Sequence, residues 1–429
     1  MERDNRWIYI LIGYAIALMP ILLLRDLTPD NEARYLSIVD DALSNGTFFT
    51  FRFEGEIYAD KPPFFFWLMM LSKLACGGYC PWLMIVLFAL LPGLATVWIM
   101  DRWLADDVAP KWRTPATMML LTSAFFLASV VVLRMDMLMT MFIVLSLRSF
   151  WRIRQQEGNV GLERWLFPVY LFMALFTKGP IGILMPLCGT VAFLAVSGEL
   201  KQIGRYWGWR TWGVLLGLCA VWFGCVYAEG GWAYLDNMLF HQTVGRAVNS
   251  FRHDHSAFYY CGAIWYILFP WSIAVIGCML ASLWPKERRT DMQRFMLTMS
   301  IATFIMLSCI SSKLQVYMLP AIPFFTYSAI LALPRYGGNV WIRAGLTVPA
   351  VGYVLALPGI IVTARIDGLA FLGSGFFYAA ACVLTVSGIW ALTRLWGAKA
   401  DTNMAIRVMA VSFMAAIFVG GFAVTNLTF

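Results

Sequence analysis

Long apolar stretches recur along the whole chain, and short polar segments separate them. Each stretch is long enough, or nearly so, to cross a hydrocarbon core of about 30 Å as an α-helix. The pattern predicts a single transmembrane domain, residues 1–429, with about thirteen membrane-spanning helices. Their expected ranges are 7–24, 82–100, 114–132, 137–151, 163–177, 180–197, 210–228, 258–283, 295–310, 314–333, 341–362, 373–393 and 404–425.

One further apolar stretch, Phe64–Ala75, is short and follows Pro62 and Pro63. If it crossed the membrane, every later loop would change sides. If it lies along the membrane surface instead, 21 of the 32 Lys and Arg residues share the side of the N-terminus. Because an excess of Lys and Arg marks the cytoplasmic side, we expect an interfacial helix here. This topology makes 25–81 the first periplasmic loop and 229–257 a second large one. Because no hydrophilic stretch is long enough for a separate soluble domain, we expect no C-terminal soluble domain.

The composition supports a helical membrane protein. Hydrophobic residues make up 61% of the 429 residues and charged residues 13%, about half the charged share of an ordinary soluble domain. A transmembrane β-barrel is excluded, because its strands alternate apolar and polar residues whereas these runs are continuous. The net charge of +8 comes from basic residues in short loops, which is typical of membrane topology rather than of nucleic-acid binding. We therefore expect an all-α polytopic protein, with the lipid bilayer and no nucleic acid as a partner.

Charged motifs gather on the predicted periplasmic side, in segments that are far apart in the sequence. Their candidate residues are Asp30, Glu32, Arg34, Asp60, Lys61, Arg134, Asp136, Lys178, Lys313 and Tyr317. A carboxylate at the mouth of a membrane domain can accept a proton, while guanidinium and ammonium groups can hold a phosphate. Each motif alone also fits a solvated loop, a structural ion pair or an interfacial lysine. Their convergence on one face predicts an active site at the membrane surface.

The second large loop contains all three histidines, and two of them raise the question of a metal site. His253 and His255 could hold a divalent metal together with Asp60, but no strong ligand spacing accompanies them. Arg246, in the same loop, is better explained as an anion contact. We therefore expect no required cofactor and leave the divalent metal open.

The nine cysteines give little indication of function. Seven of them lie in or near apolar segments, where a thiol behaves as a small hydrophobic group. Cys76 and Cys80 flank a short predicted periplasmic turn, where they could form a disulfide or stay free.

The chain contains no Gly-rich GxxxxGK[ST] loop, so ATP-driven transport has no support. Cations on the outer face without a nucleotide motif favour a lipid-linked phosphate donor drawn from the bilayer. A flippase or transporter for a lipid-linked anion is the alternative. That alternative predicts charges spread through the membrane depth, whereas these charges gather at helix ends.

Taken in order, these motifs resemble those of the membrane-embedded GT-C glycosyltransferases that use polyprenyl-phosphate sugars. In particular, they resemble the motifs of the lipid A aminoarabinose transferases and of their relatives, the protein O-mannosyltransferases. The resemblance runs from about residue 1 to residue 333 and rests on segments 29–35, 60–63, 134–137, 177–179 and 311–320. It implies an inverting transferase of the bacterial inner membrane that faces the periplasm. The donor would be a sugar on a polyprenyl phosphate such as undecaprenyl phosphate, and the acceptor would be lipid A, another glycolipid or glycan, or a protein.

The resemblance also implies residue roles. This chain has Asn31 where the family has its catalytic Asp. The base would therefore be Asp30, through a one-residue shift, or Glu32, and Asp30 is favoured. Asp136 matches a second acidic position that orients the site or assists the acceptor. The positions that match donor-phosphate contacts are Arg34, Lys61, Lys178, Arg246, Lys313 and Tyr317. The aminoarabinose transferases usually carry a soluble domain after their last helices, and no such domain is expected here. The resemblance therefore does not imply specificity for lipid A.

Overall fold

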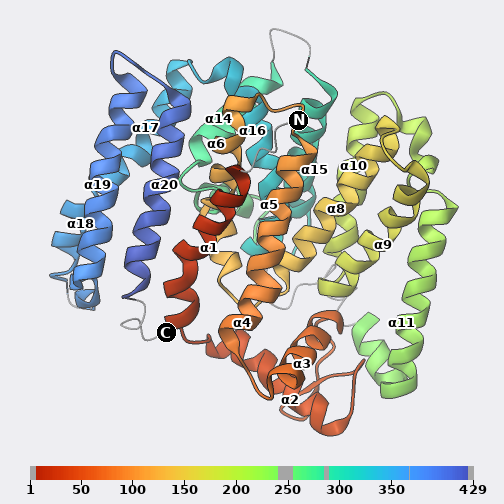
Figure 1. The fold of residues 1–429 in the computed structure, drawn as a ribbon. Coiled ribbons are helices and arrows are strands. Elements are labelled where there is room, and N and C mark those ends of the chain that lie inside the picture. Colours follow the sequence, from red (N-terminus) through yellow and green to blue (C-terminus); the bar gives the residue numbers. More distant parts are fainter. Residues whose placement is uncertain (1–5, 240–254, 285–288, 367, 424–429) are drawn as a thin grey trace.

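The computed structural model describes residues 6–239, 255–284, 289–366 and 368–423, without the side chains of Arg6, Pro29 and Asp30. Within these ranges the chain is predominantly helical. Figure 1 shows long helices packed side by side in one bundle, with α2 (Arg34–Asn45) and α3 (Phe64–Cys76) beyond one end of it. The predicted all-α polytopic architecture is confirmed.

The bundle contains the following described helices, in chain order. They are α1 (Arg6–Leu24), α4 (Pro81–Ile85), α5 (Leu91–Trp103), α6 (Pro110–Leu121), α7 (Ala124–Val130), α8 (Asp136–Gln155), α9 (Val160–Lys178), α10 (Ile181–Val196), α11 (Trp209–Asp236), α13 (Tyr259–Ile267), α14 (Ser272–Leu283), α15 (Asp291–Cys309), α16 (Ile322–Tyr336), α17 (Val340–Val354), α18 (Ala356–Thr363), α19 (Gly375–Trp396) and α20 (Thr402–Gly421). The π-helical segments η1 (Pro29–Ala33) and η2 (Val86–Leu90) and the 3-10 segments η3 (Leu200–Arg205), η5 (Gln315–Ala321) and η6 (Ala370–Gly373) connect or extend them. The strands in the described ranges, β1 (Arg52–Phe53) and β2 (Glu56–Ile57), pair antiparallel in the first loop.

The centre of the bundle is the span formed by η5 and α16. In the most apolar stretch of this span, 94% of the residues are buried. Close to it, the rings of Phe150, Phe193 and Phe295 pack with centroids 5.0–6.3 Å apart. The helices from α17 to α20 form one side of the bundle, next to α1 (Figure 1). The loops that join these helices lie at the two ends of the bundle (Figure 1).

Eight of the described helical segments are long and apolar enough to cross a membrane, and the bent pairs α13–α14 and α17–α18 raise the number to ten. The predicted number of thirteen is therefore not confirmed, although every predicted segment contains helix. Three segments make the difference, each for its own reason. The helix α8 carries Asp136 and three arginines, α10 has only 16 residues, and α6 and α7 are separated by a break at residues 122–123.

The short helix α3 has the properties expected of an interfacial helix. It begins after Pro63, as predicted, and ends at Gly77, whose left-handed φ of 65° favours glycine. Its 13 residues extend about 20 Å, which is too short for a hydrocarbon core of about 30 Å. Phe65 and Phe66 are buried against the protein, while Leu74 on the other face is 66% exposed. One face is therefore free to lie in the membrane surface.

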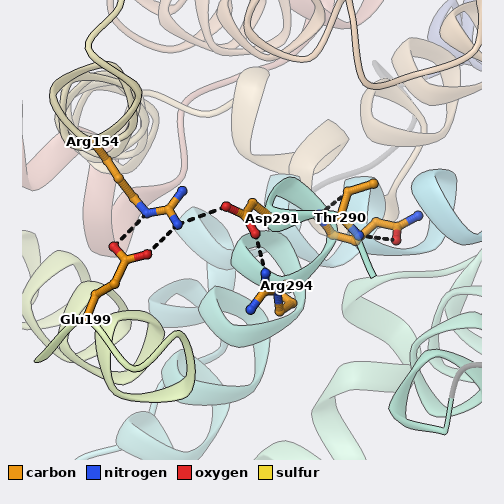
Figure 2. Close-up of polar contacts among 6 residues, drawn as sticks. Arg154, Glu199, Thr290, Asp291 and Arg294 are labelled. Atoms are coloured by element: carbon orange, nitrogen blue, oxygen red, sulfur yellow. Dashed lines mark hydrogen bonds and ion pairs between the residues drawn. The ribbon is translucent and has the colours of Figure 1, made fainter. Parts of the chain in front are cut away.

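At the end of the bundle opposite α2 and α3, loops predicted to be cytoplasmic are joined by ion pairs. Arg154, near the end of α8, donates to both carboxylate oxygens of Glu199 at 3.0 and 2.6 Å and to Asp291 at 2.9 Å (Figure 2). Arg294 pairs with the other oxygen of Asp291. Three loops that are distant in the sequence thus meet at one end, as the predicted topology requires.

Candidate active site

Asp136 is the carboxylate at which several of the predicted motifs meet. It is the first residue of α8 and is almost fully buried. Arg134 Nε donates to Asp136 Oδ2 at 3.1 Å, and the ammonium of Lys178 pairs with Asp136 Oδ1. Lys178 is the last residue of α9 and lies 5.2 Å from the centre of the Tyr317 ring. Two cations share one carboxylate, so the cluster as a whole is positive and attracts anions.

A cavity of about 330 Å³ adjoins this cluster. Its polar wall consists of Asp60, Lys61, Lys178, Ser312 and Tyr317. Its apolar wall includes Leu175, Ile181, Leu184, Trp222, Phe223, Met238 and Leu239. A cavity with cations at one end and hydrocarbon-like side chains along the other suits an amphiphile with an anionic head and an apolar tail.

Glu32 links the first loop to the turn that precedes α8. It is fully buried. Its two oxygens accept hydrogen bonds from Arg25 at 2.9 and 2.5 Å, from the amide and hydroxyl of Thr28 at 2.8 and 2.9 Å, and from the Leu133 amide at 2.6 Å. Burial by itself raises the pKa of Glu32, but these hydrogen bonds and the charge of Arg25 bring that pKa below its ordinary value. Glu32 is therefore ionised and holds Leu133 in place beside Arg134.

Arg34 begins α2 and is oriented by two aromatic rings. Its Cζ lies 6.0 Å from the centre of the Tyr35 ring and 5.9 Å from that of Tyr58. Its Nη2 donates to Asn31 Oδ1 at 3.3 Å, and its buried Nε has no hydrogen-bond partner among the described residues. Ring contacts orient a guanidinium without using its N–H donors. Arg34 thus keeps donors for an anion.

The first loop is fastened to the end of α11 by two residues that the sequence did not single out. The Glu229 carboxylate accepts from the amides of residues 48–50 at 2.6–2.7 Å and from one hydroxyl of that segment at 2.8 Å. The Tyr234 hydroxyl accepts from the Phe51 amide at 3.1 Å and donates to the Tyr58 carbonyl at 2.8 Å. These contacts hold the segment that leads into the polar wall of the cavity. The signal in the sequence was an isolated acid at the end of an apolar span.

Lys313, which was predicted to hold phosphate, is buried and donates to two backbone carbonyls. Its Nζ lies 2.5 Å from the Ile310 oxygen and 2.9 Å from the His255 oxygen. The His255 ring is exposed and stacks on Tyr259 with centroids 4.5 Å apart. Lys313 therefore ties the second large loop to the start of η5 and keeps one further donor, because an ammonium carries three.

Some of the predicted site lies beyond the described residues. This holds for Arg246 and His253 and for the side chain of Asp30. In the described part of the chain, no group of three or more His, Cys, Asp or Glu residues is placed to hold a metal ion. Cys76 and Cys80 are both free thiols in the structure.

No protein-family model matches the chain. Its sequence is similar to the undecaprenyl phosphate-alpha-4-amino-4-deoxy-L-arabinose arabinosyl transferase 2 of Pseudomonas fluorescens, with 23% identity over 329 residues that cover 74% of this chain and 54% of that protein. The undecaprenyl phosphate-alpha-4-amino-4-deoxy-L-arabinose arabinosyl transferase of Pseudomonas aeruginosa is 23% identical over 357 residues, which cover 80% of this chain and 63% of that protein. The chain thus spans less than two thirds of the length of these relatives.

Among solved structures, ArnT from Cupriavidus metallidurans bound to undecaprenyl phosphate matches with a TM-score of 0.79 and 19% identity, covering 99% of this chain and 78% of that one. The fold is that of ArnT. The predicted GT-C-like fold and the predicted resemblance to the aminoarabinose transferases are thereby confirmed. The ArnT-like fold extends over nearly the whole chain, beyond the range of about residues 1–333 expected from the motifs.

Proposed function

We propose that the chain is an inverting glycosyltransferase that moves a sugar from a polyprenyl-phosphate donor to an acceptor at the periplasmic face of the bacterial inner membrane. The cavity beside Lys178 carries the proposal, because it joins a cationic end to an apolar wall. A polyprenyl-phosphate sugar has the matching parts, an anionic phosphate and a hydrocarbon chain. The ArnT of similar fold was solved with undecaprenyl phosphate, a lipid of this class.

In the proposed complex the phosphate lies against the polar wall of the cavity, between α9 and the first loop. The proposed phosphate contacts are Arg34, Lys61, Lys178, Arg246, Lys313 and Tyr317. Asp136 holds Lys178 and Arg134 by ion pairs, so its proposed role is to orient these cations. Preorganised cations stabilise the charge that develops on a leaving phosphate.

The proposed reaction is a single displacement, which inverts the anomeric configuration. The acceptor oxygen bonds to the anomeric carbon while the bond from that carbon to the phosphate oxygen breaks, and polyprenyl phosphate leaves with the electron pair. A carboxylate takes the proton of the acceptor hydroxyl. Of the two acids proposed for this step, Glu32 already accepts five hydrogen bonds, which favours Asp30 as the base and Glu32 as the residue that positions the turn before α8.

The proposed orientation places the cavity outside the cell and the Arg154 ion pairs inside it. Its support is the excess of Lys and Arg in the loops at the Arg154 end. A compartment-sensitive reporter fused after Gly78 should report the periplasm. A cytoplasmic signal from that fusion would reverse the orientation.

Transfer by the purified full chain tests the proposed reaction. A panel of polyprenyl-phosphate sugars is offered with lipid A, a glycolipid and a peptide acceptor, and product stereochemistry is read by NMR. We expect release of polyprenyl phosphate with an inverted anomeric centre, and a release at least about a hundredfold slower with Lys178→Gln. Movement of the donor across reconstituted vesicles without any transfer would instead support the flippase alternative.

A deletion strain identifies the sugar and the acceptor independently of the panel. Mass spectrometry of its lipid A, glycans and envelope proteins should show the loss of one sugar modification, restored by the unaltered gene and not by the Lys178→Gln variant. Identical profiles in all three fractions would contradict a transferase function.

A further inference from the structure

A second cavity lies at the end of the bundle opposite the candidate active site. It measures about 260 Å³ and is formed by the start of α9, η3 and the start of α11. Three arginines, Arg164, Arg205 and Arg210, line it together with Tyr206, and the lining contains no Asp or Glu. The helix α9 rises about 21 Å from Arg164 to Lys178. The two cavities are therefore separated by much of the membrane thickness.

Several polar groups of this cavity lack a partner within the described part of the chain. Arg164 Nε, Arg210 Nε and the hydroxyl of Tyr206 are buried and form no hydrogen bond there. Buried polar groups in native proteins are nearly always paired, and a group left unpaired in the interior costs about 1–3 kcal/mol. Three such groups lie beside one cavity, so its wall holds hydrogen-bonding groups that no described residue uses.

The acids that are close to the cavity in sequence do not neutralise its arginines. Glu163 pairs with Arg152, and Glu199 pairs with Arg154. The cavity arginines form no ion pair with any carboxylate in the described ranges. The positive charge of the cavity is therefore available to an outside anion.

Two of the arginines are held by contacts that leave their charge uncompensated. Arg205 Nη2 donates to the Ile153 carbonyl at 2.8 Å, and Arg210 Cζ lies 5.2 Å from the centre of the Trp165 ring. Trp165 is 53% exposed and Trp209 is 82% exposed. Exposed tryptophans of this kind are typical of the headgroup level of a bilayer. The cavity thus lies where a headgroup phosphate would be within reach.

We propose that Arg164, Arg205 and Arg210 form a binding site for a phosphate group, supplied either by the headgroup of an anionic lipid or by free phosphate. The planar fork of a guanidinium matches two phosphate oxygens at once. Basic pockets between membrane helices on the cytoplasmic side suit anionic headgroups. The site shares no residue with the proposed transferase site, so it stands or falls separately from that function.

The test compares the full chain in detergent with the triple variant Arg164→Gln, Arg205→Gln, Arg210→Gln. Native mass spectrometry counts bound phosphatidylglycerol or phosphatidylcholine, and the thermal midpoint is followed during titration with each lipid or with inorganic phosphate. Binding of phosphatidylglycerol by the triple variant should be at least about tenfold weaker, because charge-assisted hydrogen bonds are lost.

The control variant Arg102→Gln, Arg394→Gln, Lys399→Gln removes the same charge from the same end of the bundle, outside the cavity. It should bind phosphatidylglycerol as the unaltered chain does. An equal loss in the control and the cavity variant would overturn the proposal, because net charge alone would then explain the binding. If the triple cavity variant does not fold, Arg164→Gln alone should still weaken binding by about threefold.

The ligands distinguish the two sources of the phosphate. Displacement of phosphatidylglycerol by inorganic phosphate assigns the site to the phosphate group itself, and retention of phosphatidylglycerol with no effect of phosphate assigns it to the lipid headgroup. Both outcomes support the site. Equal affinity of the unaltered chain and the cavity variant for every ligand would refute it.

Discussion

Replacing Glu32 with Gln should destabilise the protein strongly, because it removes a buried charge from a complete set of hydrogen bonds. The side chain of Glu32 is 0% exposed and that of its partner Arg25 is 8% exposed. After the change, Arg25 keeps its buried charge without a counter-charge. Removing one partner of a buried ion pair costs about 3–5 kcal/mol. The Gln carbonyl still accepts from Thr28 or Leu133, so we expect a loss near the lower end, about 3 kcal/mol.

The free energy of unfolding can be measured in detergent by titration with a denaturing detergent. The set comprises Glu32→Gln, Arg25→Met and the double variant, since a double-mutant cycle isolates the pair from its neighbours. We expect a coupling of about 2–3 kcal/mol. The control is Glu56→Gln, the same substitution at an exposed acid of the same loop, which should change stability by less than about 0.5 kcal/mol.

One stability result would refute this reasoning. An unfolding free energy of Glu32→Gln equal to that of the control would show that the buried ion pair contributes nothing.

The pH dependence of transfer separates positioning from proton transfer. If Glu32 only positions the turn before α8, the variant loses rate but keeps the shape of the pH profile. Loss of the titration that marks the base would make Glu32 the base in place of Asp30.

Three further predictions concern Lys178, Glu229 and the pH dependence of stability. Lys178→Gln should lower transfer by at least about a hundredfold because a cation is lost from the phosphate site; Lys178→Arg should recover part of it, and equal rates for both variants would exclude a charge effect. Glu229→Gln should loosen residues 48–50 and speed cleavage of the first loop in limited proteolysis, whereas Glu54→Gln should not; equal cleavage would contradict the clamp. The folded protein holds the pKa of Glu32 below its ordinary value, about 4.3 in an unfolded chain. The unfolded chain then binds the proton first as the pH falls, so the unfolding free energy should be steady above that pH and decrease below it, and Glu32→Gln should remove that part of the decrease.

Much of the fold could be predicted because a helix that is buried in a membrane needs a long run of consecutive apolar residues, which can be recognised in the sequence. The predicted start of the interfacial helix at Phe64 agrees with the structure, since the preceding prolines and the length of the apolar run are both local features. The number of spans could not be predicted in the same way. A helix such as α8 carries three arginines in its last two turns, and only its neighbours in the bundle decide how that end is accommodated.

The candidate site was predicted as a set of residues but not as a set of contacts. Asp136, Lys178 and Tyr317 were placed on one side by topology, and the structure brings them together. Lys313 was placed there too, but its ammonium donates to two carbonyls. No local pattern distinguishes a lysine that faces a cavity from one that ties two loops, because the difference depends on which backbone passes nearby.

The sequence by itself determined the helical membrane class and the gathering of acids and bases at one end of the bundle. These properties depend on the hydrophobicity of consecutive residues and on the distribution of Lys and Arg. Only the tertiary structure decided which polar groups pair. Glu32 meets Leu133, and Glu229 meets residues 48–50, across roughly one hundred and one hundred and eighty positions of sequence. Such pairs form because a buried polar group must find a partner wherever packing places one, and packing is a property of the whole chain.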